Sequence, residues 1–194
     1  MHAGRGIVHS ERAGGVGPAH GLQLWVALPT KDEDSEPMFE HIAADRIPEV
    51  PIDGGLLRVL AGEAFGVRSP VTVRSPLAYV DVRLQPGARL LLEGSMLRER
   101  AVYLISGHAQ TAGTGHGATE MWVLEEGVDV TIEAEDDVHL VLIGGDPLDG
   151  TRHIWWNFVA SDREAIERAK EDWRHRRFPL VPGDEVEFVP LPGL

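Results

Sequence analysis

Short stretches in which apolar and polar side chains alternate recur along most of this chain, and they constrain its fold more than any other feature. Residues 77–84 are one example, reading Leu-Ala-Tyr-Val-Asp-Val-Arg-Leu. Alternation with a period of two is typical of a strand with one buried face. Gly or Pro turns separate the stretches at near-regular spacing, as in a sandwich or barrel. Strands are predicted over residues 22–28, 56–61, 71–74, 77–84, 100–106, 120–124, 128–134 and 138–143.

Turn residues predict how these strands are connected. Residues 85–88, Gln-Pro-Gly-Ala, offer Pro and Gly in the order that a type II turn requires, and they predict a hairpin. Residues 125–127, Glu-Glu-Gly, predict a similar turn. The glycine-rich loop 113–117 is interpreted as a hairpin tip, because no helix follows it to complete a phosphate-binding loop.

Composition narrows the classes of partner and compartment. The 194 residues include 31 acidic and 18 basic ones, and a formal net charge of −13 disfavours nucleic acid and anionic membranes as partners. The chain has no Cys, which excludes disulfides and thiolate metal sites and fits a cytoplasmic location. No apolar stretch approaches the length of a membrane span, and no secretory signal is visible.

One helix is predicted near the end of the chain. Ser161 and Glu164 have the spacing of a capping box, in which each side chain can meet a backbone N–H of the first turn. Phe178 and Pro179 are expected to end this helix. Three apolar residues recur at helical spacing and would dock on the barrel: Ile166, Ala169 and Trp173.

The candidate chemistry lies at the beginning of the chain, where His9 and Glu11 are two residues apart. On an extended segment such a pair points to the same face and can converge on one ion. An imidazole and a carboxylate suit a divalent metal such as iron, with open positions left for dioxygen. The alternative interpretation is a pair of solvated polar side chains, since this spacing alone is a weak signal.

The opening residues 1–29 carry a family resemblance. They begin Met-His-Ala-Gly-Arg-Gly-Ile-Val-His-Ser-Glu and resemble the pirin family of two-domain cupins. The run Arg-His-Ile-Trp-Trp-Asn-Phe-Val at residues 152–159 and the tail 178–192 are also similar to that family. The resemblance implies that His9 and Glu11 are the later of two ligand pairs for Fe(II) or another divalent metal. The earlier His-x-His pair would lie before Met1, so the site is expected to be incomplete in this truncated chain.

The resemblance also implies a mainly β fold of the cupin (double-stranded β-helix, jelly-roll-like) class. Residues 1–30 would be the C-terminal remnant of an N-terminal cupin domain, and residues 31–51 a linker. Residues 52–150 would form one complete C-terminal cupin domain. Residues 151–194 would form the C-terminal helix and a tail that packs on the barrels.

The second barrel is expected to be structural. Cupin spacing places Glu93, Ser95 and Glu99 where ligands would sit, so the imidazoles of a metal site are missing. His139 lies near the later His position, but a lone His in an apolar strand is more often a hydrogen-bonded residue than a ligand. His108 and His116 flank the predicted hairpin tip and are not expected to be ligands.

Two functions from different classes follow. The resemblance implies a metal-dependent oxygenase similar to quercetin 2,3-dioxygenase, acting on an aromatic, flavonol-type substrate, with Glu11 as a ligand that also removes a proton. The alternative is a non-catalytic, regulatory cupin module that binds a protein partner. Strand edges left unpaired in residues 7–29 further predict self-association.

Overall fold

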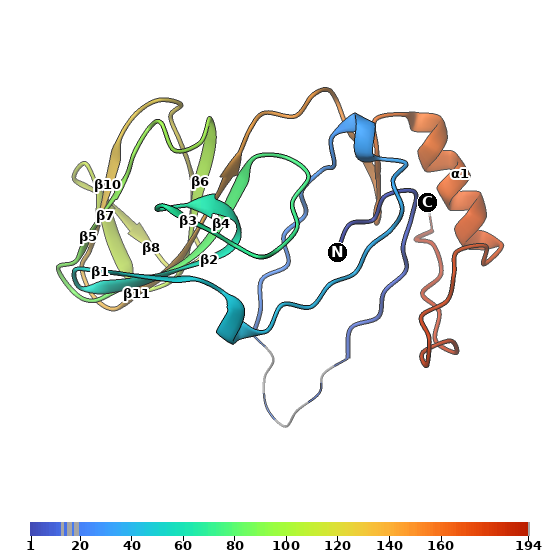
Figure 1. The fold of residues 1–194 in the computed structure, drawn as a ribbon, viewed down its shortest axis with the longest axis horizontal. Helices are drawn as coiled ribbons and strands as arrows, with labels where there is room; N and C mark the ends of the chain where they lie inside the picture. The colour runs from blue at the N-terminus through green and yellow to red at the C-terminus, as the bar shows by residue number, and fades with distance from the viewer. Residues whose placement is uncertain (13, 15–16, 18–19, 194) are drawn as a thin grey trace. The chain divides into compact units, whose positions relative to one another are not determined.

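The computed structural model describes residues 1–12, 14, 17 and 20–193, and the chain divides into two compact units. Glu40–Pro147 form the first, here called the sheet unit. Met1–Phe39 and Leu148–Leu194 form the second, called the terminal unit because it is built from both ends of the chain. Figure 1 labels most strands of the sheet unit and, in the terminal unit, the helix α1.

The sheet unit is an antiparallel, cupin-like pair of sheets. The seven-stranded sheet runs β1-β2-β4-β11-β6-β9, with β3 paired to β2. The four-stranded sheet runs β5-β10-β7-β8. A short 3-10 helix, η2 (Ala44–Arg46), precedes the first strand. The strands are β1 (Glu49–Ile52), β2 (Gly55–Ala64), β3 (Val67–Arg68), β4 (Leu77–Leu84), β5 (Arg89–Leu92), β6 (Glu99–Ser106), β7 (His108–Thr111), β8 (Thr114–Gly117), β9 (Met121–Leu124), β10 (Val130–Ala134) and β11 (Val138–Gly145).

Alternation builds the core between the two sheets. In β4 every second residue is buried, from Ala78 to Leu84, while the intervening side chains point away from the core. Leu90, Leu92, Ile132 and Ala134 of the smaller sheet join the same buried cluster. This arrangement confirms the mainly β, cupin-type fold that the period-two pattern and the resemblance predict.

A buried arginine of the sheet unit links two separate parts of the backbone through hydrogen bonds. Arg100, which is 1% exposed, donates hydrogen bonds to four backbone carbonyls, at distances of 2.7–3.1 Å. Those carbonyls follow β5 and precede β10, so the guanidinium joins two turns that are far apart in the sequence. The accepting residues are Leu92, Glu93, Glu125 and Val128.

Two of the predicted turns form, but they do not make hairpins. Gly87 has a φ of +80°, and the N–H of Ala88 donates to the carbonyl of Gln85 at 3.0 Å. The strands on either side, β4 and β5, lie in different sheets. The same holds for the turn with Gly127, which carries the chain from β9 to β10. The hairpin prediction at residues 85–88 was therefore wrong. β7 and β8 do pair as a hairpin, but residues 114–117, which were interpreted as part of its tip, form the strand β8 itself.

The terminal unit has an aromatic cluster in place of a sheet core. The hairpin of β12 (His153–Trp155) and β13 (Phe158–Ala160) precedes α1 (Arg163–Arg174). The N-terminal segment of the unit contains a short 3-10 helix, η1 (Thr30–Asp32). Ring centroids of neighbouring members are 5.1–6.4 Å apart, a distance range typical of attractive ring pairs. The cluster consists of Trp155, Trp156, Phe158, Trp173, Phe178 and Phe188.

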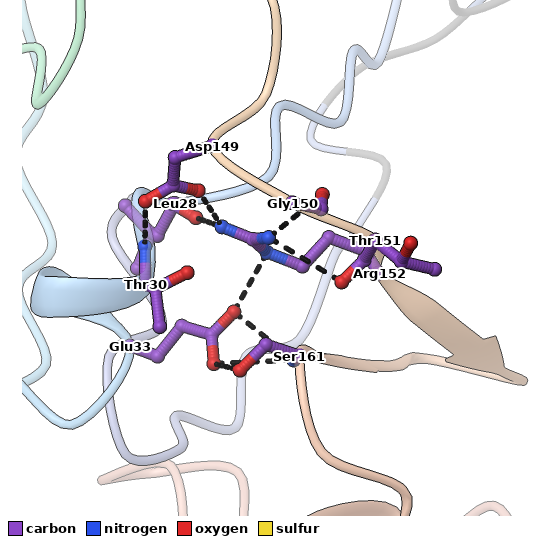
Figure 2. Close-up of polar contacts among 8 residues, drawn as sticks. All are labelled: Leu28, Thr30, Glu33, Asp149, Gly150, Thr151, Arg152 and Ser161. Atoms are coloured by element: carbon purple, nitrogen blue, oxygen red, sulfur yellow. Dashed lines mark hydrogen bonds and ion pairs between the residues drawn. The ribbon is translucent and has the colours of Figure 1, made fainter.

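A network centred on Arg152 joins the two chain ends of this unit, as Figure 2 shows. The guanidinium lies 2.7 Å from a carboxylate oxygen of Glu33 and donates to the carbonyl of Leu28 at 2.8 Å. Asp149 pairs with the same guanidinium and also accepts the backbone N–H of Thr30 at 2.8 Å. The Arg152 side chain is only 4% exposed, so these contacts hold residues 28–33 against residues 149–152.

The helix begins differently from the capping-box prediction. Asp162 is the N-cap, and its carboxylate accepts the N–H of Glu164 at 3.0 Å. Ser161 instead bonds to Glu33, with its hydroxyl at 2.6 Å from the carboxylate. The helix ends at Arg174, four residues earlier than Phe178. Ser161, which the local pattern assigned to the cap, therefore binds the carboxylate of Glu33, 128 residues away in the sequence.

Two predicted strands are not formed. Residues 20–29 contain no strand, and residues 71–74 form bends and irregular structure. The rest of the 7–19 stretch that is described also contains no strand, and Ala13, Gly15, Val16, Pro18 and Ala19 lie outside the described residues. The self-association prediction rested on strand edges in residues 7–29, so it remains a prediction without that support.

Candidate metal centre

His9 and Glu11 lie in an irregular segment of the terminal unit, and their side chains face each other. The Nε2 atom of His9 is 3.9 Å from a carboxylate oxygen of Glu11. Both side chains are open to solvent, with exposed fractions of 40% and 74%. The pair that the spacing predicts on one face therefore does converge, although no strand supports it.

The donor chemistry of this pair fits part of a metal shell. A neutral imidazole nitrogen and a carboxylate oxygen are ligands that suit divalent iron and similar ions. Among the residues that the structure describes, no group of three or more His, Asp or Glu side chains could hold an ion. His9 and Glu11 are thus two donors that would need further ligands to hold an ion.

Among the described residues, His2 does not join His9 and Glu11 in a group of three that could hold an ion. Its backbone pairs with Met38 in an isolated antiparallel bridge, with N–O distances of 2.8 and 3.0 Å. Close by, Arg5 donates its backbone N–H to the carbonyl of Ser35 at 3.0 Å. These contacts tie the first residues of the chain to residues 35–38.

Two residues that the sequence analysis missed form hydrogen bonds with Glu11 or with its neighbour Arg12. Gln23 donates a side-chain N–H to the carboxylate of Glu11 at 3.2 Å, which orients one candidate ligand. Asp184 accepts two N–H groups of Arg12, from Nε at 2.9 Å and from Nη2 at 2.6 Å. The signal for Asp184 was available in part, since Val-Pro-Gly-Asp at residues 181–184 is a turn sequence. Its partner, 172 residues away, was not readable from that turn.

Three histidines of the sheet unit have partners of their own. His139 of β11 hydrogen-bonds through Nε2 to Asp81 of β4 at 2.5 Å, which confirms the expectation of a hydrogen-bonded residue. His108 bonds to Asp136 at 2.7 Å, and this hydrogen bond raises the pKa of His108 above its ordinary value. The ring of His116 stacks on Trp122 with centroids 4.2 Å apart.

Comparison with known proteins places the chain among pirins. Residues 79–179 match the family model of the pirin C-terminal cupin domain. A pirin-like protein of Caulobacter vibrioides is 42% identical over 99% of this chain, and human pirin is 36% identical over 91% of it. The crystal structure of quercetin 2,3-dioxygenase from Acinetobacter baumannii superposes with a TM-score of 0.77 over 88% of this chain, at 31% identity.

The match covers only part of each relative. The chain spans 68% of the Caulobacter protein, 63% of human pirin and 57% of the Acinetobacter chain. No helix in the described part of the chain is long and apolar enough to cross a membrane.

Proposed function

The chain belongs to the pirin family, and from that premise we propose that it supplies His9 and Glu11 to a divalent metal site of a quercetin 2,3-dioxygenase-like oxygenase. The observation that carries this proposal is the convergence of the two donor atoms, 3.9 Å apart, in a segment without regular structure. The likeness to the Acinetobacter quercetin 2,3-dioxygenase supports the choice of reaction and of a flavonol-type substrate.

Each side chain has a distinct role in this proposal. His9 is the neutral donor, and Glu11 is the anionic donor that can accept a proton from a substrate hydroxyl. Gln23 donates to Oε1 of Glu11, the same oxygen that lies 3.9 Å from Nε2 of His9, and so helps to orient this carboxylate. A bound divalent ion, Fe(II) in the first instance, would supply Lewis-acid stabilisation of negative charge on the substrate oxygens.

The test uses the protein expressed from the whole reading frame. We expect it to bind one Fe(II) per chain and to consume oxygen with quercetin, and we expect His9→Ala to abolish both. His175→Ala is the matched control, because His175 also lies near a carboxylate, that of Glu171 at 3.5 Å, on an exposed surface. Metal content that is unchanged in His9→Ala would overturn the assignment.

A second candidate function is a non-catalytic module that binds a regulatory protein partner, which the acidic composition of the chain permits. Metal analysis separates the two functions. Stoichiometric, tightly held iron in the purified 194-residue chain would contradict the module, and metal-free protein that does not consume quercetin would favour it.

A further inference from the structure

A tight turn in the C-terminal tail presents Asp184 to the segment that holds His9 and Glu11. The N–H of Asp184 donates to the carbonyl of Val181 at 3.0 Å, and Gly183 has a φ of +81°. Pro182 precedes that glycine, and this order of residues is the one a type II turn favours. The backbone of Asp184 is therefore held in place by its own turn.

The carboxylate of Asp184 contacts the residues on both sides of Glu11. Arg12 reaches it with Nε at 2.9 Å and Nη2 at 2.6 Å, and the Ser10 hydroxyl also donates to it. These hydrogen bonds, first that of Arg12 and then that of Ser10, hold the pKa of Asp184 below its usual range. Arg12 forms a second ion pair with Glu187 of the same tail.

The contacts alternate along the segment. Ser10 and Arg12 meet Asp184, whereas the donor atoms of His9 and Glu11 meet each other. A carboxylate that holds the residues on both sides of Glu11 therefore restricts the conformations open to this short segment and to the pair of donors within it.

A second contact anchors the same segment from its other end. Gly6 has a φ of +128°, and a Cβ atom there would lie only 2.5 Å from Cε1 of Phe178. The backbone at Gly6 thus lies directly against an aromatic ring of the tail. Contacts at Gly6 and at Arg12 bracket the two candidate ligands.

We propose that Asp184 is a positioning residue, which holds Ser10 and Arg12 so that His9 and Glu11 converge on a divalent metal ion. This inference rests on the proposed function, since it gives the pair its orientation. An exposed ion pair contributes little by itself. Here the bidentate Arg12 geometry and the turn make the contact directional, so its effect falls on ligand geometry more than on overall folding.

The test measures metal binding to the 194-residue chain by NMR, with Mn²⁺ alone as the probe. Selective paramagnetic broadening of the His9 ring signals is followed as Mn²⁺ is added, and His9→Ala assigns those signals. We expect Asp184→Asn to weaken this binding about tenfold, the lower end of the loss typical for residues that orient metal ligands. Asp184→Glu keeps the charge and should recover most of the affinity.

Asp172→Asn is the matched control, because Asp172 accepts from Arg177 at 2.9 Å in the same unit without contacting residues 7–12. It should leave Mn²⁺ binding within about twofold of wild type. Chemical shifts outside residues 7–12 and 175–193 should stay constant in Asp184→Asn, which a general loosening of the unit would not allow.

The outcomes separate this inference from the proposed function. Wild-type binding at His9 that Asp184→Asn leaves unchanged would overturn the positioning role and leave the metal site standing. Absence of selective broadening at His9 in the wild-type chain would overturn this inference, whereas the proposed function is decided by the iron content of the protein from the whole reading frame. If Asp184→Asn fails to fold, the double variant Ser10→Ala/Asp184→Glu decides. It removes the serine contact and moves the carboxylate, so wild-type-like Mn²⁺ binding to it would contradict the role.

Discussion

The sheet unit and the terminal unit are stabilised in different ways. In the sheet unit, alternating strands bury aliphatic side chains such as Val80 and Leu140, which are fully shielded from solvent. In the terminal unit, ion pairs hold residues 1–39 to residues 148–193, and an aromatic cluster packs within residues 155–188. Ile166, which is 5% exposed, is the one buried hydrophobic side chain among the described residues of this unit. The candidate metal ligands lie in the unit that depends on long-range polar contacts.

This difference indicates which substitutions should affect the stability of the fold and which should affect the candidate site. Strands with a period-two pattern bury their apolar side chains in a shared core, and substitutions of residues outside that core are tolerated. The geometry around His9 and Glu11 instead depends on partners such as Asp184, at the other end of the chain. Substitutions in the first unit should therefore change folding, and substitutions in the second should change local order.

The largest effect is expected from Arg100→Ala in the sheet unit. The substitution removes four hydrogen bonds to backbone carbonyls and leaves a cavity, so we expect the free energy of unfolding to fall by about 4 kcal/mol. Urea denaturation followed by circular dichroism measures it. Arg98→Ala is the control, since Arg98 is 62% exposed and pairs only with Glu126 at the surface. Equal losses in the two variants would contradict the role given to Arg100.

A smaller but more local effect is expected from Arg152→Ala in the terminal unit. Glu33 and Asp149 would lose their shared partner, and we expect a destabilisation of about 3 kcal/mol confined to this unit. Hydrogen exchange measured by mass spectrometry should speed up in residues 28–33 and stay unchanged in β4 and β11. Arg168→Ala, at an exposed helix position, should leave both regions unchanged. Faster exchange throughout the sheet unit would break the comparison between the units.

The two residues at the start of α1 offer a sharper test of the same comparison. Asp162→Ala removes the N-cap acceptor and should destabilise the first turn of the helix by about 1 kcal/mol. Ser161→Ala should leave the helix intact and instead speed up amide exchange near Glu33, to which its hydroxyl donates. Exchange rates of residues 163–166 and 30–34 separate the two effects. Fraying of the helix in Ser161→Ala would restore the original capping-box interpretation.

The smallest effect is a pH dependence in the sheet unit. The hydrogen bond between His108 and Asp136 raises the pKa of the imidazole and lowers that of the carboxyl. A raised folded-state pKa means that the stabilisation is complete below the ordinary His value of about 6.5 and is lost as pH rises through the raised value. The lowered pKa of Asp136 means that its contribution is present above its ordinary value and is lost in acid.

NMR titration of the His108 ring checks this expectation. In Asp136→Asn the side-chain oxygen can still accept a hydrogen bond, but the charge is gone, so the pKa of His108 should return toward its ordinary value. A His108 pKa that is unchanged by Asp136→Asn would show that the carboxylate is not the cause.

The strands of the sheet unit were largely predictable because their signal is local. Residues 77–84 were predicted as a strand and β4 covers the same eight residues. Residues 85–88 were predicted as a turn, which is present, but its flanking strands enter different sheets. A turn sequence determines that the chain reverses and leaves the choice of sheet to partners elsewhere.

Residues 22–28 illustrate the opposite case. Their alternation predicted a strand, and the structure leaves them irregular. A strand needs a neighbour to accept and donate its backbone hydrogen bonds, and the alternation does not say whether one is present. The same limit applies to the candidate site, where the spacing of His9 and Glu11 predicted their convergence without indicating Gln23 or Asp184.

By itself the sequence determined the positions of β2, β4, β6, β9, β10 and β11, two turn locations and the pairing of an imidazole with a carboxylate two residues away, but it missed β1, β3, β5, β7 and β8. Each of the features that it determined depends on the backbone geometry of a few consecutive residues. The tertiary structure decided which sheet each strand joins, which residue caps the helix and which side chains hold the candidate ligands. Arg12 and Asp184 are 172 residues apart, and only folding of the two chain ends into one unit brings their charges together.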